Sequence, residues 1–131
     1  MKRLYIIVEG HTEQEFVNLM IAPYMQQYGV YSVTPVLIRT SKTGRGGFVN
    51  YNYLENDVRR LLYSKNADFV VSMFVDYFRI PNNLPNKEKW EHMDNHLEQI
   101  IMMEKCIAEE INDNRFIPYI QMHEFEALLF S

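Results

Sequence analysis

Five acidic side chains stand at or just beyond the ends of apolar segments in this sequence. They are Glu9, Glu13, Asp76, Glu124 and Glu126. The preceding segments, residues 4–8, 68–75 and 116–122, are rich in apolar residues, and 4–8 is typical of a strand buried on both faces of a parallel sheet. Because ligands bind at the carboxyl ends of such strands, the five acids are candidates for one site.

Carboxylates gathered at one sheet edge need a compensating cation. Two of them about 5 Å apart repel by roughly 3 kcal/mol at an effective dielectric constant of 20. Oxygen-only ligands favour Mg²⁺ or Mn²⁺ over zinc. We therefore predict that Glu9, Glu13 and Asp76 hold a metal ion and that Glu124 and Glu126 supply a second metal site or a base. Taken singly, each acid has a structural explanation, at a helix N-terminus or on a solvated face.

Other residues could take part in the same chemistry. Lys42 and Arg45 lie in a glycine-rich basic loop, residues 39–47, which we expect to contact phosphate although it lacks the spacing of a nucleotide triphosphatase loop. His123 is a candidate ligand or general base, and a hydrogen-bonded structural role is the alternative. The aromatic residues Phe48, Tyr51 and Tyr53 could stack on bases, but anchoring a loop to the core is the commoner use.

Elements with strand and helix patterns alternate along the chain. We expect strands near 3–8, 31–38, 68–75 and 116–122. Helices are predicted from a capping box at Thr12 and Glu15, around 54–62, from Lys87 onward, and from His123. The first helix should bury Phe16, Leu19, Met20 and Tyr24, and the third should bury Trp90, Met93, Leu97, Ile100, Ile101, Ala108 and Ile111. Pro23 should kink or restart the first helix.

This alternation predicts an α/β fold with a doubly wound parallel sheet and helices on both faces. Right-handed crossovers favour the strand order 2-1-3-4, which places Glu9 opposite Asp76 at the switch point. His92 and His96 would then share a helix at a spacing that can bind zinc, but no third ligand is evident and a solvated face is favoured.

Composition limits the class of protein. The 131 residues, of which 47% are apolar, form one domain, residues 1–131. A net charge of −4 argues against binding nucleic acid by bulk charge alone. The single cysteine, Cys106, favours a reducing, cytoplasmic setting, and no apolar segment is long enough for a membrane span. The sequence ends at Ser131 just after a short apolar helix pattern, so we expect the domain to continue further; a short helix that caps the sheet is the alternative.

Three segments carry a family resemblance: VEGHTEQEF at 8–16, FVDYF at 74–78 and FIPYIQMHEFEALLF at 116–130. Together they resemble an uncharacterised bacterial family of TOPRIM-like proteins, related to the TOPRIM domain of the OLD (overcoming lysogenization defect) nucleases. The resemblance implies a compact α/β fold that holds Mg²⁺ for phosphodiester chemistry. It matches Glu9 and Glu13 to the first acidic motif, Asp76 to the first acid of an Asp-x-Asp motif, and Glu124 with Glu126 to the later acidic pair.

The sequence departs from that pattern at Phe78, which stands where the second Asp of Asp-x-Asp should be. The late basic residue of the OLD nucleases has no counterpart before Ser131. Two interpretations follow. One is a metal-dependent nuclease, acting on DNA rather than RNA, in phage or foreign-DNA defence beside an ABC-type ATPase. The other is a non-catalytic module that binds nucleic acid or such an ATPase. A homodimer is a candidate assembly. A receiver-type phosphoacceptor is disfavoured, because the paired acid and the late lysine that it needs are missing.

Overall fold

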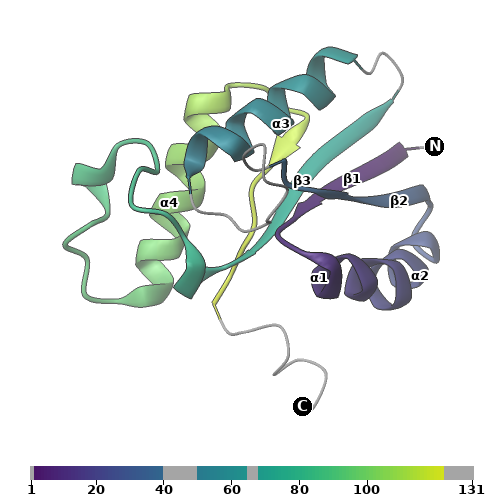
Figure 1. Ribbon diagram of the computed structural model, residues 1–131, viewed down its shortest axis with the longest axis horizontal. Helices are drawn as coiled ribbons and strands as arrows, with labels where there is room; N and C mark the ends of the chain where they lie inside the picture. Colours follow the sequence, from purple (N-terminus) through teal and green to yellow (C-terminus); the bar gives the residue numbers. More distant parts are fainter. Residues whose placement is uncertain (1, 40–49, 65–67, 123–131) are drawn as a thin grey trace.

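The computed structural model describes residues 2–39, 50–64 and 68–122, and it contains one central sheet with helices on both sides (Figure 1). The strands are β1 (Lys2–Val8), β2 (Val30–Leu37), β3 (Phe69–Asp76), β4 (Phe116–Ile117) and β5 (Ile120–Gln121). The helices are α1 (His11–Phe16), the π-helical η1 (Val17–Ile21), α2 (Ala22–Gln26), α3 (Tyr51–Ser64) and α4 (His96–Ile111), with short 3-10 turns η2 (Tyr77–Arg79) and η3 (Lys87–Lys89).

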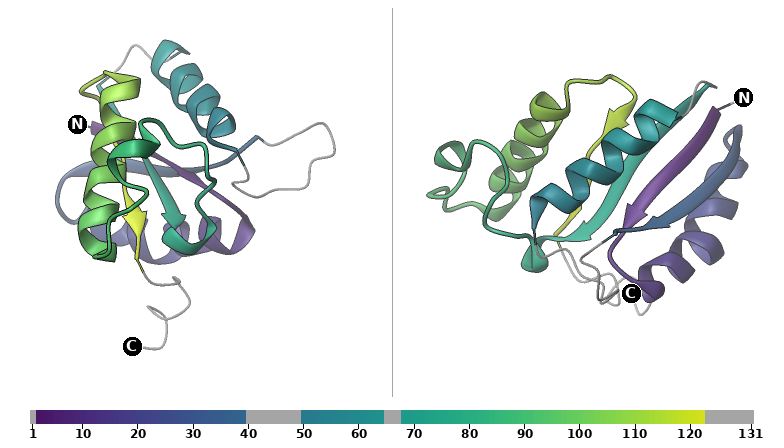
Figure 2. Two further views of the ribbon diagram at one scale, coloured as in Figure 1. Left: turned by 90° about the vertical axis from the view of Figure 1, so that its left-hand side faces the viewer. Right: turned by 45° about the horizontal axis from the view of Figure 1, so that its top comes forward.

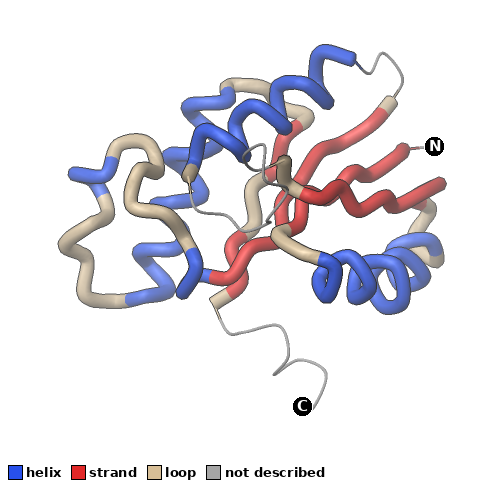
Figure 3. The backbone as a smooth tube through the Cα atoms, viewed as in Figure 1, coloured by secondary structure: helices blue, strands red, loops and turns tan. Residues whose placement is uncertain are grey.

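The sheet is parallel, and its strand order β2-β1-β3-β4 is the predicted 2-1-3-4. Ile7 of β1 lies opposite Val36 of β2 on one side and Met73 of β3 on the other. The fourth predicted strand is divided into β4 and β5, both of which pair with β3 (Figure 3). Pro118 lies between them, and a proline has no N–H to donate to a strand ladder.

The two faces of the sheet are covered by different helices, as Figures 1 and 2 show. On one face, Ile7, Val71 and Met73 pack with residues of α3 and α4. On the other face, Ile6, Val8 and Phe74 pack with residues of the α1–η1–α2 segment. Successive strand residues point to opposite faces of the sheet, and both faces are covered by helices. Residues on both faces must therefore be apolar, which explains the continuous apolar runs of β1 and β3.

The first helical segment differs from the prediction in its start and in its buried face. It begins at His11 after the extended residue Gly10, and no side chain caps it, so the predicted capping box is wrong. Leu19, Met20 and Tyr24 are exposed, whereas the buried positions recur at longer spacing, at Glu13, Val17 and Ala22. The wider π-helical turn of η1 explains this spacing. Pro23 lies in the first turn of α2, as a restart requires.

The long helix α4 begins at His96 and not at Lys87. Asn95 caps it, because its Oδ1 accepts a hydrogen bond of 3.0 Å from the backbone N–H of Glu98. The preceding residues form the turn η3, entered through the left-handed residue Asn86. His92 therefore lies outside the helix that contains His96. The two histidines are not one helical turn apart, so the arrangement considered for zinc binding is absent.

The buried face of α4 also differs in part from the prediction. Ile100 and Ile111 are buried as expected, and Trp90 is buried although it lies outside the helix. Leu97 and Ile101 are each 57% exposed, whereas the buried stripe is completed by Met103, Cys106 and Ile107. The two stripes have similar helical spacing, and packing in the core cluster with residues of the sheet and of α3 selects one of them.

Candidate functional site

The carboxyl edge of β1 and β3 brings two predicted acids into contact. Glu9 directly follows β1, Asp76 ends β3, and the two strands are neighbours. Glu9 Oε1 accepts a hydrogen bond of 3.1 Å from the backbone N–H of Asp76. Glu9 is 5% and Asp76 4% exposed. The parallel register thus places both buried acids side by side at the switch point, at the carboxyl ends of neighbouring strands.

Glu13 joins this pair from the first turn of α1. It is buried, and its carboxylate folds back over the strand–helix turn, because a Cβ added at Gly10 would lie 3.2 Å from Glu13 Oε2. A larger residue at position 10 would therefore press on Glu13. The short path Glu9-Gly10-His11, which starts the helix at once after the strand, positions this third acid.

The electrostatics of the site reflect burial first and the neighbouring acids second. The pKa of Glu9 is raised from its ordinary value of 4.5 to about 7, mainly by burial and to a smaller extent by the charges of Glu13 and Asp76. The Asp76 N–H and the Arg79 guanidinium act in the opposite direction. Arg79 Nη1 lies 3.8 Å from Glu9 Oε2, and the Arg79 side chain is 60% exposed. The cation that pairs with Glu9 is thus itself mostly solvated.

The donor set fits a lightly coordinated hard cation. In the described parts of the chain, no group of three or more His, Cys, Asp or Glu side chains is arranged to hold a metal. Mg²⁺ does not require such a group, because it keeps several waters and takes one or two carboxylates. Glu9 and Asp76 meet that requirement, with Glu13 close to them, whereas zinc would need four nitrogen or sulfur ligands of the usual structural type.

The turn η2 follows Asp76 directly, and a chain of polar contacts anchors it. Tyr77 Oη donates a hydrogen bond to Gln99 Oε1, and Gln99 Nε2 donates one of 2.8 Å to the backbone oxygen of Trp90. The Tyr77 ring also lies 5.3 Å from the His96 ring. Gln99 is buried on the apolar face of α4. A polar amide at a position of the apolar stripe was the sequence signal that could have predicted a buried hydrogen-bond partner there.

Two further residues with structural roles were not foreseen from the sequence. Asp57 of α3 is 1% exposed; its Oδ2 accepts a 2.8 Å hydrogen bond from the Arg39 N–H, and its Oδ1 lies 2.7 Å from Arg60 Nη1. Asp57 therefore holds the chain where it leaves β2. The second unforeseen residue is Arg79, which forms the ion pair with Glu9.

The remaining predicted site residues lie outside the described residues: Lys42, Arg45, His123, Glu124 and Glu126, together with Phe48. The helix predicted from His123 lies there too. Tyr51 is described; it is 4% exposed and packs in the core, the loop-anchoring use favoured for it.

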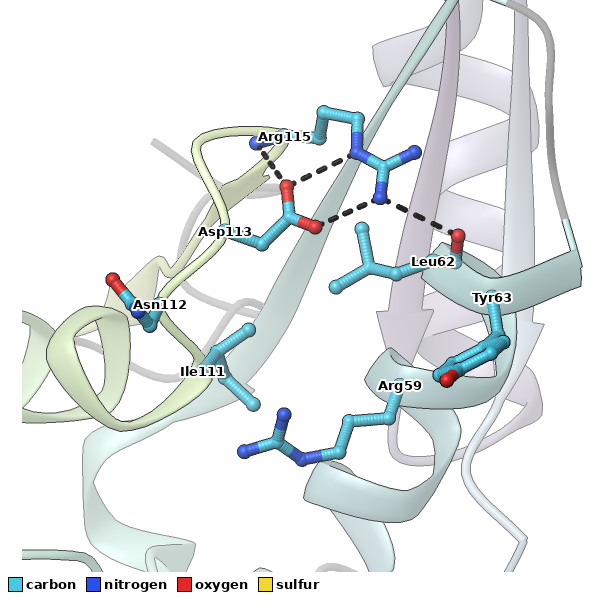
Figure 4. A pocket seen from close by; sticks show the side chains of 7 residues that line it. All are labelled: Arg59, Leu62, Tyr63, Ile111, Asn112, Asp113 and Arg115. Carbon is cyan, nitrogen blue, oxygen red and sulfur yellow. Dashed lines mark hydrogen bonds and ion pairs between the residues drawn. The ribbon is translucent and has the colours of Figure 1, made fainter.

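A cavity of about 330 Å³ opens at the opposite edge, where the strands begin. It lies between the C-terminal ends of α3 and α4 (Figure 4) and is lined by Arg59, Leu62, Tyr63, Ile111, Asn112, Asp113 and Arg115. Its two cations are already paired, Arg115 with Asp113 at 2.8 Å and Arg59 with Glu55 at 2.9 Å. Arg115 Nη2 also contacts the Leu62 oxygen at 3.4 Å, so this corner ties α3 to the turn after α4.

Fold and site together define a class: a parallel, doubly wound α/β domain with buried acidic residues at its switch point. The chain belongs to the family described as Domain of unknown function (DUF4276), which matches residues 8–131. No curated protein and no solved structure matches it. Within the described residues, no helix is long and apolar enough to cross a membrane.

Proposed function

We propose that this domain performs Mg²⁺- or Mn²⁺-dependent phosphodiester chemistry of the nuclease type on nucleic acid, with a TOPRIM-like site related to that of the OLD nucleases. The observation that carries the proposal is the buried contact between Glu9 and Asp76 at the switch point. Three buried acids near an exposed arginine are a costly arrangement unless a cation or a proton offsets part of their charge. The strand order is that expected for this class of fold.

The residues would divide the work as follows. Glu9 and Asp76 would hold the cation, with Glu13 close by, and the cation would polarise a phosphate and lower the pKa of a bound water. The Asp76 N–H fixes the orientation of the Glu9 carboxylate, because it binds Oε1 and leaves Oε2 towards Arg79. Arg79, largely solvated, can reach a phosphate oxygen of the substrate.

The experiment is a plasmid-nicking assay with Mg²⁺ and with Mn²⁺. We expect weak, Mn²⁺-stimulated nicking by the wild type. Glu9→Gln and Asp76→Asn should reduce it by about a hundredfold or more, since loss of an essential ligand raises a barrier by several kcal/mol. Glu15→Gln is the matched control, because Glu15 is an exposed acid of the same helix α1. If both site variants cut as well as wild type, the site is misplaced.

A non-catalytic role is the second candidate, and Phe78 favours it. This residue is 66% exposed and provides no oxygen ligand where the resemblance expects a second Asp. In this alternative, the domain keeps the fold and binds DNA or a companion ABC-type ATPase. Failure of the wild-type protein to cut DNA or RNA with any divalent cation would favour this role over the nuclease.

A further inference from the structure

The turn η2 presents two exposed side chains directly after Asp76. Phe78 is 66% exposed, and the Arg79 side chain is 60% exposed. The turn itself is held in place, since Tyr77 is anchored to α4 through Gln99 and the Ile80 N–H donates a hydrogen bond of 3.3 Å to the Tyr77 oxygen. A fixed turn thus carries an aromatic ring and a guanidinium directly after the buried Asp76.

The ring of Phe78 is placed for contact with a ligand. It meets the Tyr77 ring in an edge contact, with centroids 5.2 Å apart and planes at 78°, and most of its surface remains exposed to solvent. Exposure of an apolar phenylalanine ring to water is unfavourable, whereas the face of an aromatic ring can stack on any nucleobase. Phe78 cannot bind a metal, but its exposed ring, two residues after Asp76, can stack on a base.

Arg79 supplies the complementary charge. Its Nη1 lies 3.8 Å from Glu9 Oε2, which places a planar cation next to the acids. A guanidinium recognises phosphate oxygens in a forked geometry. Because side chains in a 3-10 turn are about 120° apart, Phe78 and Arg79 point in different directions from one turn and can contact a base and a phosphate of the same strand.

We propose that Phe78 and Arg79 bind the substrate, through a base and a phosphate respectively, and that this substrate is single-stranded nucleic acid. The inference rests on the proposed function. In a duplex the base faces are covered by neighbouring bases, so an exposed ring can stack only on an unpaired base. The net charge of −4 also limits attraction to a duplex by bulk charge, so stacking must supply much of the affinity.

The test measures binding by fluorescence anisotropy, with dye-labelled single-stranded oligonucleotides and the matching duplex, in Ca²⁺ so that cleavage is suppressed. Wild type should bind the single strand more tightly than the duplex. Phe78→Ala should weaken single-strand binding by about 5- to 150-fold, the range for loss of one stacked base, while Phe78→Trp should restore it. Arg79→Ala should weaken binding and lower the salt dependence, with a change in log–log slope of about 0.7 for one phosphate contact.

Tyr63→Ala is the control, because Tyr63 is 94% exposed and lies at the opposite edge of the sheet. Equal binding of single strand and duplex, or unchanged binding by Phe78→Ala, would overturn the inference. Its failure is separable from failure of the nuclease proposal. Phe78-dependent single-strand binding without cleavage by any divalent ion removes the nuclease alone; cleavage that Phe78→Ala leaves unchanged removes the single-strand inference alone.

Discussion

Replacing Glu9 by glutamine should make the protein more stable at alkaline pH. Burial and the neighbouring acids raise the pKa of Glu9 to about 7 in the folded protein, against 4.5 in an unfolded chain. The folded state therefore binds more protons between these two values, and the free energy of unfolding falls as the pH rises through this window. The amide of the Glu9→Gln variant has no such proton to lose, and its Oε1 can still accept the Asp76 N–H.

The size of the effect follows from the two pKa values. At 1.36 kcal/mol for each tenfold change, ionisation of a group shifted from 4.5 to about 7 destabilises the fold by about 3 kcal/mol, most of it between pH 5 and pH 8. The contact with Arg79 is largely solvated, so its loss in the variant changes stability by less than about 1 kcal/mol. Between pH 5 and pH 8, wild type should thus lose about 2.5 kcal/mol more than Glu9→Gln.

Urea denaturation at pH 5, 6, 7 and 8, in EDTA, measures this difference directly. Glu104 has a raised pKa through burial as well, so the wild-type curve alone would not isolate Glu9. The difference between wild type and Glu9→Gln does isolate it, and Glu15→Gln serves as the exposed control. Parallel pH curves for wild type and Glu9→Gln would refute the reasoning, because they would mean that Glu9 ionises freely in the folded protein.

Three other expectations concern the fold and the cation. Ile100→Ala should lower the free energy of unfolding by about 2–5 kcal/mol, whereas Ile101→Ala should change it by less than about 0.5 kcal/mol, since Ile100 is 4% and Ile101 57% exposed; equal urea midpoints would contradict the assigned face of α4. Asn95→Ala removes the cap of α4 and should reduce the free energy of unfolding by about 1 kcal/mol in the same assay, and an unchanged value would place the helix start elsewhere. Mn²⁺ at a hundredfold excess over its Kd should stabilise wild type by about 2.7 kcal/mol in thermal unfolding at pH 8 and Asp76→Asn much less; equal gains would show binding elsewhere.

The strand order and the meeting of Glu9 with Asp76 were predictable from the sequence. Both acids end continuous apolar runs, and such runs are typical of strands covered on both faces. Once helices alternate with these strands, the handedness of the crossovers leaves few arrangements, and parallel neighbours end at the same edge. Local pattern and general topology were therefore sufficient for this part of the site.

Where helices begin, and which of their sides is buried, was decided by tertiary structure. On α4, a stripe with Leu97 and Ile101 fits helical spacing as well as the stripe that is buried, and only the position of the sheet selects between them. The π-helical turn η1 changes the phase of the first helical segment without a sequence signal that periodicity could detect. Propensity within a segment cannot specify contacts with partners that are distant in the sequence.

The character of the site also emerged only in three dimensions. Arg79 approaches Glu9 from a distant part of the chain, Glu13 folds back over Gly10, and burial by the surrounding elements raises the pKa of Glu9. The sequence determined which ionisable groups end the strands. Their proton affinity depends on desolvation and on distances to other charges, and these quantities exist only once the chain has folded.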